Sequence, residues 1–378
     1  MKEIRALTGL RGIAALVVFW GHSYESLRVH GLSSEMPLAI QRLFLSGTRQ
    51  VDIFFVLSGF ILALIYRDWF TRGMTQATYW EFLRRRLARI WPLHAFILMM
   101  VLAMVLIAQT LSLATRGGLD RFVLADLPDH LILVHAWGPF TEDGGAWNPP
   151  SWSISIETIG YMVFPVMLWL TVRARSSPLL LLGLATCIGF GLNSFIPWGL
   201  DGVRGVARGL SEFFFGCVLA KLFVGPVAAW LQGRVGSLLS VALLVGGFLL
   251  VAKAGFIIAV LVAPLMLALC GDNAPARLLG SKPLHFLGEV SFSIYLGHFL
   301  YMSILNRVIK PEWMLGGTGQ MVVGLLLMNV IVVALSTLTY RYIEQPGRAW
   351  LSGRSKPSGT GGTPPTVPAS VPAVSKAG

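Results

Sequence analysis

The sequence predicts an all-α, polytopic membrane protein whose helices cross the bilayer about ten times, and three observations lead to this fold class. Hydrophobic residues make up 55% of the 378 residues and charged residues only 13%, whereas an ordinary soluble domain is roughly 25% charged. The mean hydropathy is +0.69. Ten apolar runs approach the length of about 20 residues that a spanning helix needs, at 7–24, 51–66, 92–112, 152–172, 178–196, 206–224, 235–252, 255–271, 287–308 and 319–343.

The basic residues predict the orientation of these spans. If the N-terminus lies inside, the inner connecting segments hold 17 Lys and Arg residues and the outer segments hold 8, as the positive-inside rule requires. An even number of spans then makes both termini cytoplasmic. We expect the first run to stay attached, because Arg11 interrupts it and no signal-peptidase site follows. The net charge of +12 is thus explained by membrane orientation, and we expect no nucleic-acid partner.

Two segments outside the runs have distinct compositions. The longest outer loop, 113–151, contains LPDHLILVHAW, which could form a short helix on or in the membrane, and the turn-rich, aromatic GGAWNPPSWS. Residues 349–378 are rich in Gly, Pro, Ser and Thr, and are predicted to be a disordered cytoplasmic tail after a membrane domain over 1–348. All three cysteines lie in apolar runs, so we expect neither disulfides nor a metal site.

Ionisable residues inside the apolar runs are the first candidates for function, because a charge at membrane depth costs several kcal/mol. Arg208 and Glu212 are four residues apart and are expected to pair with each other. The full set comprises Arg11, His22, Asp52, Glu157, Arg208, Glu212, Lys221, Glu289, His298, Arg307 and Arg341.

Arg11 and His22 lie eleven residues apart in the first run, which places them on one helix face about 16 Å apart along the axis. One elongated anionic molecule could contact both side chains. An acyl-CoA has this shape, with phosphates at one end and a thioester on a long arm at the other. The spacing fits an alternative equally well, in which Arg11 reaches lipid phosphate and His22 is a histidine at the membrane interface.

Two carboxylates could act with this pair. Asp52 opens the second run at the same outer depth as His22, where it could orient and stabilise the imidazole; it would also serve as a helix N-cap. Glu157 lies too deep in the fourth run to reach water easily. It is predicted to donate or accept a proton, the alternative being a structural partner such as a backbone amide.

Two further groups of residues complete the candidate site. His298 shares a helix face with Ser291 and Tyr295, which indicates either a packed polar core or a cavity lining. Arg86 and Arg89, at the inner end of the third run, share a face and could bind phosphates. The alternative is that these arginines only anchor the helix at the cytoplasmic side, where Lys and Arg are enriched in membrane proteins.

Six stretches, taken together, resemble one known family. The first is an arginine followed, after ten residues, by a histidine (Arg11 and His22). The others are VDIFFVLSGF, the RRxxRIWP entry to the third run, WSISIE, SFSIYLGH and the closing RYIEQPGR. They resemble the membrane acyltransferase-3 family, the O-acyltransferases of bacterial surface glycans and related compounds. The resemblance spans about residues 4–348.

The resemblance implies a ten-helix domain in the bacterial inner (plasma) membrane that moves an acyl group, commonly acetyl, from cytoplasmic acyl-CoA to a carbohydrate hydroxyl. It implies that His22 is the catalytic histidine, that Arg11, Arg86 and Arg89 contact acyl-CoA, and that Asp52, Glu157 and His298 are polar residues of the reaction cavity. We therefore predict that His22, oriented by Asp52, acts as general base on the acceptor, and that Glu157 or His298 handles the leaving proton. A covalent acyl intermediate is an open variant.

Two other functions fit the same charges. One is a transporter of glycan or lipid intermediates, whose path the buried charges would line. The other is an acyltransferase that acts on a small-molecule glycoside. For the favoured function, the expected partners are acyl-CoA (acetyl-CoA) as donor, a carbohydrate or glycolipid acceptor, and membrane lipids; acetyl and larger acyl groups fit the sequence equally.

Overall fold

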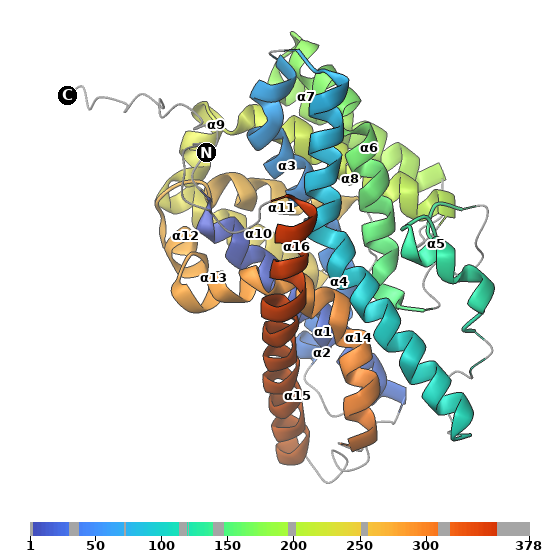
Figure 1. Ribbon diagram of the computed structural model, residues 1–378. Helices are drawn as coiled ribbons and strands as arrows, with labels where there is room; N and C mark the ends of the chain where they lie inside the picture. The colour runs from blue at the N-terminus through green and yellow to red at the C-terminus, as the bar shows by residue number, and fades with distance from the viewer. Residues whose placement is uncertain are drawn as a thin grey trace, which may run out of the picture.

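The computed structural model (Figure 1) describes residues 3–29, 38–71, 73–112, 119, 121–138, 147–195, 202–250, 256–308 and 318–353. These residues form helices and connecting loops, with no β-strand among them. A helix covers each predicted apolar run: α1 (Arg5–Val29), α3 (Gln50–Thr71), α4 (Gln76–Thr110), α6 (Trp152–Arg173), α7 (Pro178–Phe195), α8 (Gly202–Leu219), α10 (Arg234–Leu250), α11 (Ile257–Ala268), α14 (Ser291–Val308) and α15 (Thr318–Thr339). The all-helical class is confirmed.

Shorter helices connect or extend the long ones. They are α2 (Leu38–Leu45), α5 (Leu127–Leu131), α9 (Pro226–Gln232), α12 (Ala274–Leu279), α13 (Lys282–Glu289) and α16 (Gln345–Leu351). The predicted short helix of LPDHLILVHAW is α5. Residues 354–378, most of the predicted tail, lie outside the described residues.

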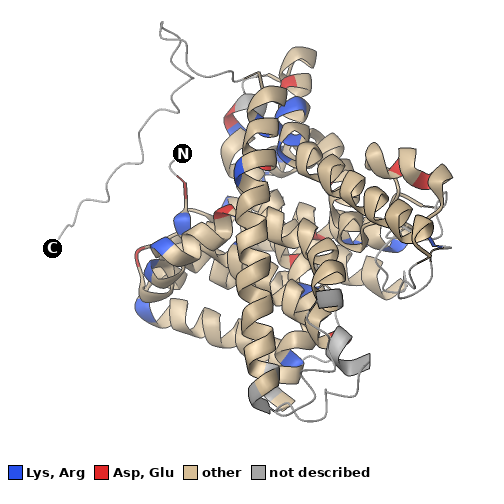
Figure 2. Ribbon diagram, turned by 60° about the horizontal axis from the view of Figure 1, so that its bottom comes forward, with Lys and Arg blue, Asp and Glu red and all other residues tan. Residues whose placement is uncertain are grey.

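Several helices are suited to a membrane. Within the described residues, five are long and apolar enough to cross one, or six if α8 and α9, which meet at a 94° bend, form one broken span. Figure 2 shows few charged residues along the long helices, whose ribbons are mostly tan, the colour of the residues other than Lys, Arg, Asp and Glu. The protein is therefore a membrane protein with several spans.

The third span differs most from its prediction. α4 begins at Gln76, far ahead of the apolar run at 92, and continues through Pro92 without a break. Thr75 and Thr78 cap its start, each side chain bonding the other's backbone N–H. Membrane helices tolerate an internal proline when neighbouring groups satisfy the freed carbonyl. Arg86 and Arg89 are consequently on a helix and not in a linker.

The last two predicted runs are interrupted helices. The ninth divides at Val290 into α13 and α14. The tenth continues from α15 into a π-helical turn, Tyr340–Glu344, before α16. Such turns are rare and often mark functional sites. In Figure 1, α14 and α15 extend side by side from the rest of the bundle.

Glycines bring two pairs of helices close together. A Cβ on Gly12 of α1 would lie 2.6 Å from the backbone nitrogen of Gly288 in α13, and one on Gly59 of α3 would overlap the carbonyl oxygen of Phe213 in α8. No residue larger than glycine fits at these contacts. The contacts fix the rotation of α1 and α3, and so determine where Arg11 and Ser58, next to each glycine, point.

Candidate active site

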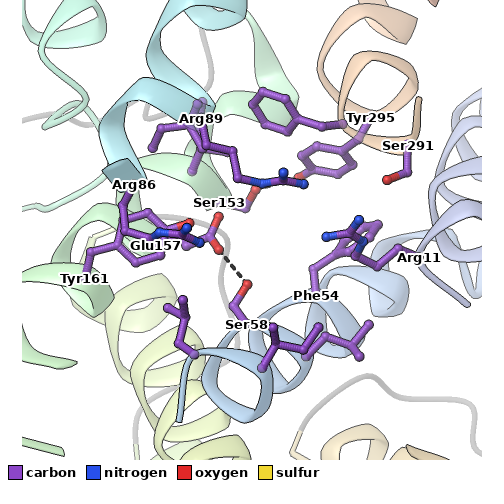
Figure 3. Close-up of a pocket in the computed structure, with 16 residues that line it drawn as sticks. Arg11, Phe54, Ser58, Arg86, Arg89, Ser153, Glu157, Tyr161, Ser291 and Tyr295 are labelled. Carbon is purple, nitrogen blue, oxygen red and sulfur yellow. Dashed lines mark hydrogen bonds between the residues drawn. The ribbon is translucent and has the colours of Figure 1, made fainter. Parts of the chain in front are cut away.

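A cavity opens between α1, α3, α4, α6 and α14. The space between the lining atoms is about 770 Å³, including the open mouth. Figure 3 shows charged and hydroxyl side chains that reach into it from different helices. The lining residues are Arg11, Phe54, Leu57, Ser58, Ile61, Leu62, Arg86, Arg89, Ile90, Ser153, Ile154, Glu157, Tyr161, Ser291, Phe292 and Tyr295.

Three arginines that lie far apart in the sequence meet at this cavity. Arg11 comes from α1, and Arg86 and Arg89 come from α4 (Figure 3). The Arg11 Nη2 lies 3.5 Å from the Gly288 carbonyl oxygen, and the Arg86 Nη2 lies 3.4 Å from the Tyr66 hydroxyl. Both bonds are long, and the buried Nε atoms of Arg11 and Arg86 have no hydrogen-bond partner among the described residues. These guanidinium groups therefore have donors left for an anion.

Glu157 also lines the cavity, bonded to a hydroxyl group. Ser58 Oγ donates to Glu157 Oε1 at 2.5 Å, and Figure 3 shows the Arg86 guanidinium beside this carboxylate. The partner is therefore a serine from α3 and not the backbone amide considered as an alternative. Ser58 lies in VDIFFVLSGF but carries no charge, so a search for charges at membrane depth does not select it.

The structure brings His22 and His298 together. Their ring centroids are 5.0 Å apart and the rings are inclined by 32°. His298 is fully buried and His22 is partly buried. Neither is among the described residues that line the cavity. The two predicted histidines thus form a pair of their own, next to the cavity and not in it.

Phe54 and Tyr295 form the cavity wall next to this pair. Their ring centroids are 5.5 Å apart, and the Tyr295 ring is 6.2 Å from that of His298. The Tyr295 hydroxyl is 2.7 Å from Ser153 Oγ and donates to the Pro150 carbonyl at 3.0 Å. Both interpretations of the α14 polar face are therefore correct in part, since Tyr295 lines the cavity while His298 is packed.

The expected contact between Asp52 and His22 is not formed. Asp52 Oδ1 accepts a hydrogen bond of 2.7 Å from Arg208 Nε, and the Arg208 guanidinium lies 5.5 Å from the Trp152 ring. Asp52 is the third residue of α3 and not its N-cap. The reason for the difference is electrostatic, because a fully buried guanidinium needs a carboxylate far more than a neutral imidazole does.

Arg208 is the centre of a buried ionic cluster. The predicted pair with Glu212 is confirmed, at 4.0 Å from Arg208 Nε to Glu212 Oε1. Asp52 is the nearer partner, and all three side chains are at most 1% exposed. The i,i+4 spacing reveals the pair within α8, whereas the contact with α3 depends on how the two helices pack.

Glu344 is a charged residue near the cavity that the hydropathy pattern does not reveal. It is 3% exposed and accepts a hydrogen bond of 2.8 Å from Ser293 Oγ. It interacts electrostatically with Arg89 and Arg11. It belongs to RYIEQPGR but lies one residue beyond the last apolar run, so a list of charges inside the runs omits it.

Comparison with known proteins decides the family. Residues 4–341 match the family profile described as an acyltransferase domain, Acyl_transf_3. The chain belongs to the acyltransferase-3 family. This confirms the resemblance carried by the six motifs. The protein is accordingly an acyltransferase.

Curated relatives agree with this assignment. Acyltransferase MdmB of Streptomyces mycarofaciens is 29% identical, over 96% of each chain. O-acetyltransferase OatA of Staphylococcus aureus (strain NCTC 8325 / PS 47) is 26% identical over 92% of this chain, which spans 58% of OatA. The putative O-acetyltransferase SACOL0978 of S. aureus (strain COL) shows the same identity and coverage. No solved structure matches the chain.

Proposed function

We propose that this acyltransferase-3 family member is an O-acyltransferase that moves an acyl group, acetyl in the first instance, from cytoplasmic acyl-CoA to a carbohydrate hydroxyl. The observation that carries the proposal is the convergence of Arg11, Arg86 and Arg89 on one largely apolar cavity that also holds Glu157. Arginines bind phosphates bidentately, and an apolar extension of the site suits a pantetheine arm. The relatives named O-acetyltransferase support acetyl as the group that is transferred.

The histidine pair supports acid–base chemistry on the acceptor. In this proposal, His22 takes the proton of the acceptor hydroxyl, and His298, whose ring lies 5.0 Å away, sets its environment. Glu157 passes a proton to the departing thiolate. Asp52 has a different role from the one predicted, because its bond to Arg208 holds α3 against α8.

The membrane arrangement belongs to the same proposal. A helix on each of the ten apolar runs supports ten spans, and the distribution of basic residues supports cytoplasmic termini, with a domain over 1–348 and a disordered tail over 349–378. The named relatives are bacterial, which supports the inner membrane as the location. A carbohydrate or glycolipid acceptor and surrounding lipids would be its partners.

Transfer in a defined system tests the function. The full chain in nanodiscs, given acetyl-CoA labelled in the acetyl group and a membrane glycan extract, should release CoA and label the glycan. The glycan mass profile of cells with and without the gene should then differ by acyl units. Movement of glycan across sealed vesicles without an acyl donor, and without labelling, would instead identify a transporter.

A further inference from the structure

The hydroxyl groups of the cavity differ in what they bond. Among the described lining residues, Ser153 donates to the Pro150 carbonyl at 3.3 Å, Ser291 donates to the Gly288 carbonyl at 2.7 Å, and Tyr295 donates to the Pro150 carbonyl at 3.0 Å. A backbone carbonyl is too weak a base to accept the proton of a hydroxyl group. Ser58 donates instead to the carboxylate of Glu157, which is a stronger base.

Tyr161 also interacts with Glu157, from one turn further along α6. Its side chain is 3% exposed and packs in the aromatic core against Phe82 and Phe213. Both side chains line the cavity, but Ser58 is only partly buried. Of these two hydroxyl groups beside Glu157, Ser58 is therefore the one more open to a ligand.

We propose that Ser58 is a nucleophile and that the acyl group passes through an ester on its Oγ. The proposal rests on the proposed function, because it takes acyl-CoA as the donor. A serine is a weak nucleophile until an adjacent base accepts its proton, and Glu157 Oε1, 2.5 Å away, is within the range for that transfer.

The first half-reaction uses groups that line the cavity. Ser58 Oγ attacks the thioester carbonyl carbon while its proton moves to Glu157. The carbon–sulfur bond then breaks, and the CoA thiolate takes the proton from Glu157, so that CoA leaves as the neutral thiol.

The second half-reaction reverses these steps with a different nucleophile. The acceptor hydroxyl attacks the ester carbonyl, and its proton passes to Glu157, which the first half-reaction left ionised. The bond from the carbonyl carbon to Ser58 Oγ breaks, and Ser58 recovers a proton through Glu157. The acyl group has then moved from sulfur to oxygen with no net gain or loss of protons or electrons.

The position of the histidines favours this two-step route. A thioester in the cavity meets Ser58 and Glu157, whereas neither His22 nor His298 is among the described lining residues, and the His298 ring is 6.2 Å from that of Tyr295 in the lining. An ester on Ser58 would keep the acyl group in place after CoA leaves. Donor and acceptor then need not occupy the site at the same time.

Isotope exchange without acceptor tests the acyl-serine directly. The full chain in nanodiscs is incubated with unlabelled acetyl-CoA and radiolabelled CoA. A covalent intermediate returns label to acetyl-CoA, whereas direct transfer to an acceptor cannot. We expect exchange by the natural protein, a loss of at least about 10² to 10⁴ in Glu157→Gln, and none in Ser58→Ala. Mass spectrometry should find one acyl unit on the peptide that contains Ser58.

Two further variants keep the result interpretable. Ser303→Ala removes a hydroxyl of α14 that donates to the Phe299 carbonyl at 2.8 Å and is not among the described lining residues, and it should exchange like the natural protein. Ser58→Cys replaces the hydroxyl with a thiol, and should restore labelling at this position. Each variant is first shown to bind acetyl-CoA, which establishes that the cavity has folded.

Two outcomes overturn the acyl-serine, and a third concerns the function. Exchange that persists in Ser58→Ala places the nucleophile elsewhere. A natural protein that acylates its acceptor but shows no exchange transfers the group directly, and the proposed function stands. Absence of both acetyl-CoA binding and transfer in the natural protein would remove the proposed function itself.

Discussion

Replacement of Arg86, compared with replacement of Arg84 in the same basic cluster, tests whether the cavity holds the phosphates of acyl-CoA. Arg86 lines the cavity, and its Nε has no partner among the described residues. The Arg84 side chain is 47% exposed, pairs with Glu81 at 2.7 Å and donates to the Leu351 carbonyl at 3.3 Å. Both variants remove one positive charge from the same turn of α4. They therefore change the net charge equally and differ only in whether the lost side chain lines the cavity.

The two positions predict different magnitudes. A hydrogen bond to a charged group contributes about 1.5–3 kcal/mol, which corresponds to a factor of about 10 to 150 in the dissociation constant. Arg86→Ala should weaken acetyl-CoA binding by that factor. Arg84→Ala removes an exposed ion pair worth about 0.2–1 kcal/mol to stability, and should leave binding within about twofold because its charge is screened by solvent.

The assay is equilibrium binding to the full chain in nanodiscs, with acetyl-CoA and with acetyl-pantetheine, which lacks the nucleotide phosphates. Arg86→Ala should weaken binding of acetyl-CoA and leave that of acetyl-pantetheine nearly unchanged. Equal losses for both ligands would show that Arg86 acts on the shape of the cavity. Equal affinities of the Arg86→Ala and Arg84→Ala proteins for acetyl-CoA would refute the phosphate site.

Three other variants test the remaining roles. His22→Ala should lower acyl transfer by about 10² to 10⁴ while acetyl-CoA binding persists, measured by label on the glycan; full transfer would remove His22 from the mechanism. Asp52→Ala leaves the buried Arg208 without its nearer carboxylate and should destabilise the fold by about 3–5 kcal/mol, seen as a lower thermal midpoint; an unchanged midpoint with lost activity would restore a catalytic role. Gly12→Ala places a Cβ 2.6 Å from the Gly288 nitrogen, and overpacking of about 1–3 kcal/mol should lower the same midpoint, a result that unaltered melting would contradict.

The sequence predicted the charged part of the site well and its contacts less well. Arg11, Arg86, Arg89 and Glu157 were selected because charges are costly in a membrane, and all four line one cavity. Ser58 escaped the same reasoning, since a serine at that depth can bond its own helix at little cost.

The error at Asp52 has a specific origin. Helix periodicity gives the depth of Asp52 and the face that Arg11 and His22 share, because these depend on one helix alone. Whether Asp52 meets His22 or Arg208 depends on which helix packs beside α3. Gly59 brings α8 there, and α8 carries the guanidinium.

Hydropathy and spacing by themselves determined that this chain is a membrane helix bundle, which apolar runs form its long helices, and which charged residues inside those runs are costly to bury. Those properties follow from transfer free energies and from 3.6 residues per turn, which act locally. Only the tertiary structure decided that Ser58 bonds Glu157, that His22 lies next to His298, and that Asp52 pairs with Arg208. Contacts of that kind depend on the rotation and crossing of helices far apart in the chain, which close glycine contacts and buried charge pairs fix only after the bundle has assembled.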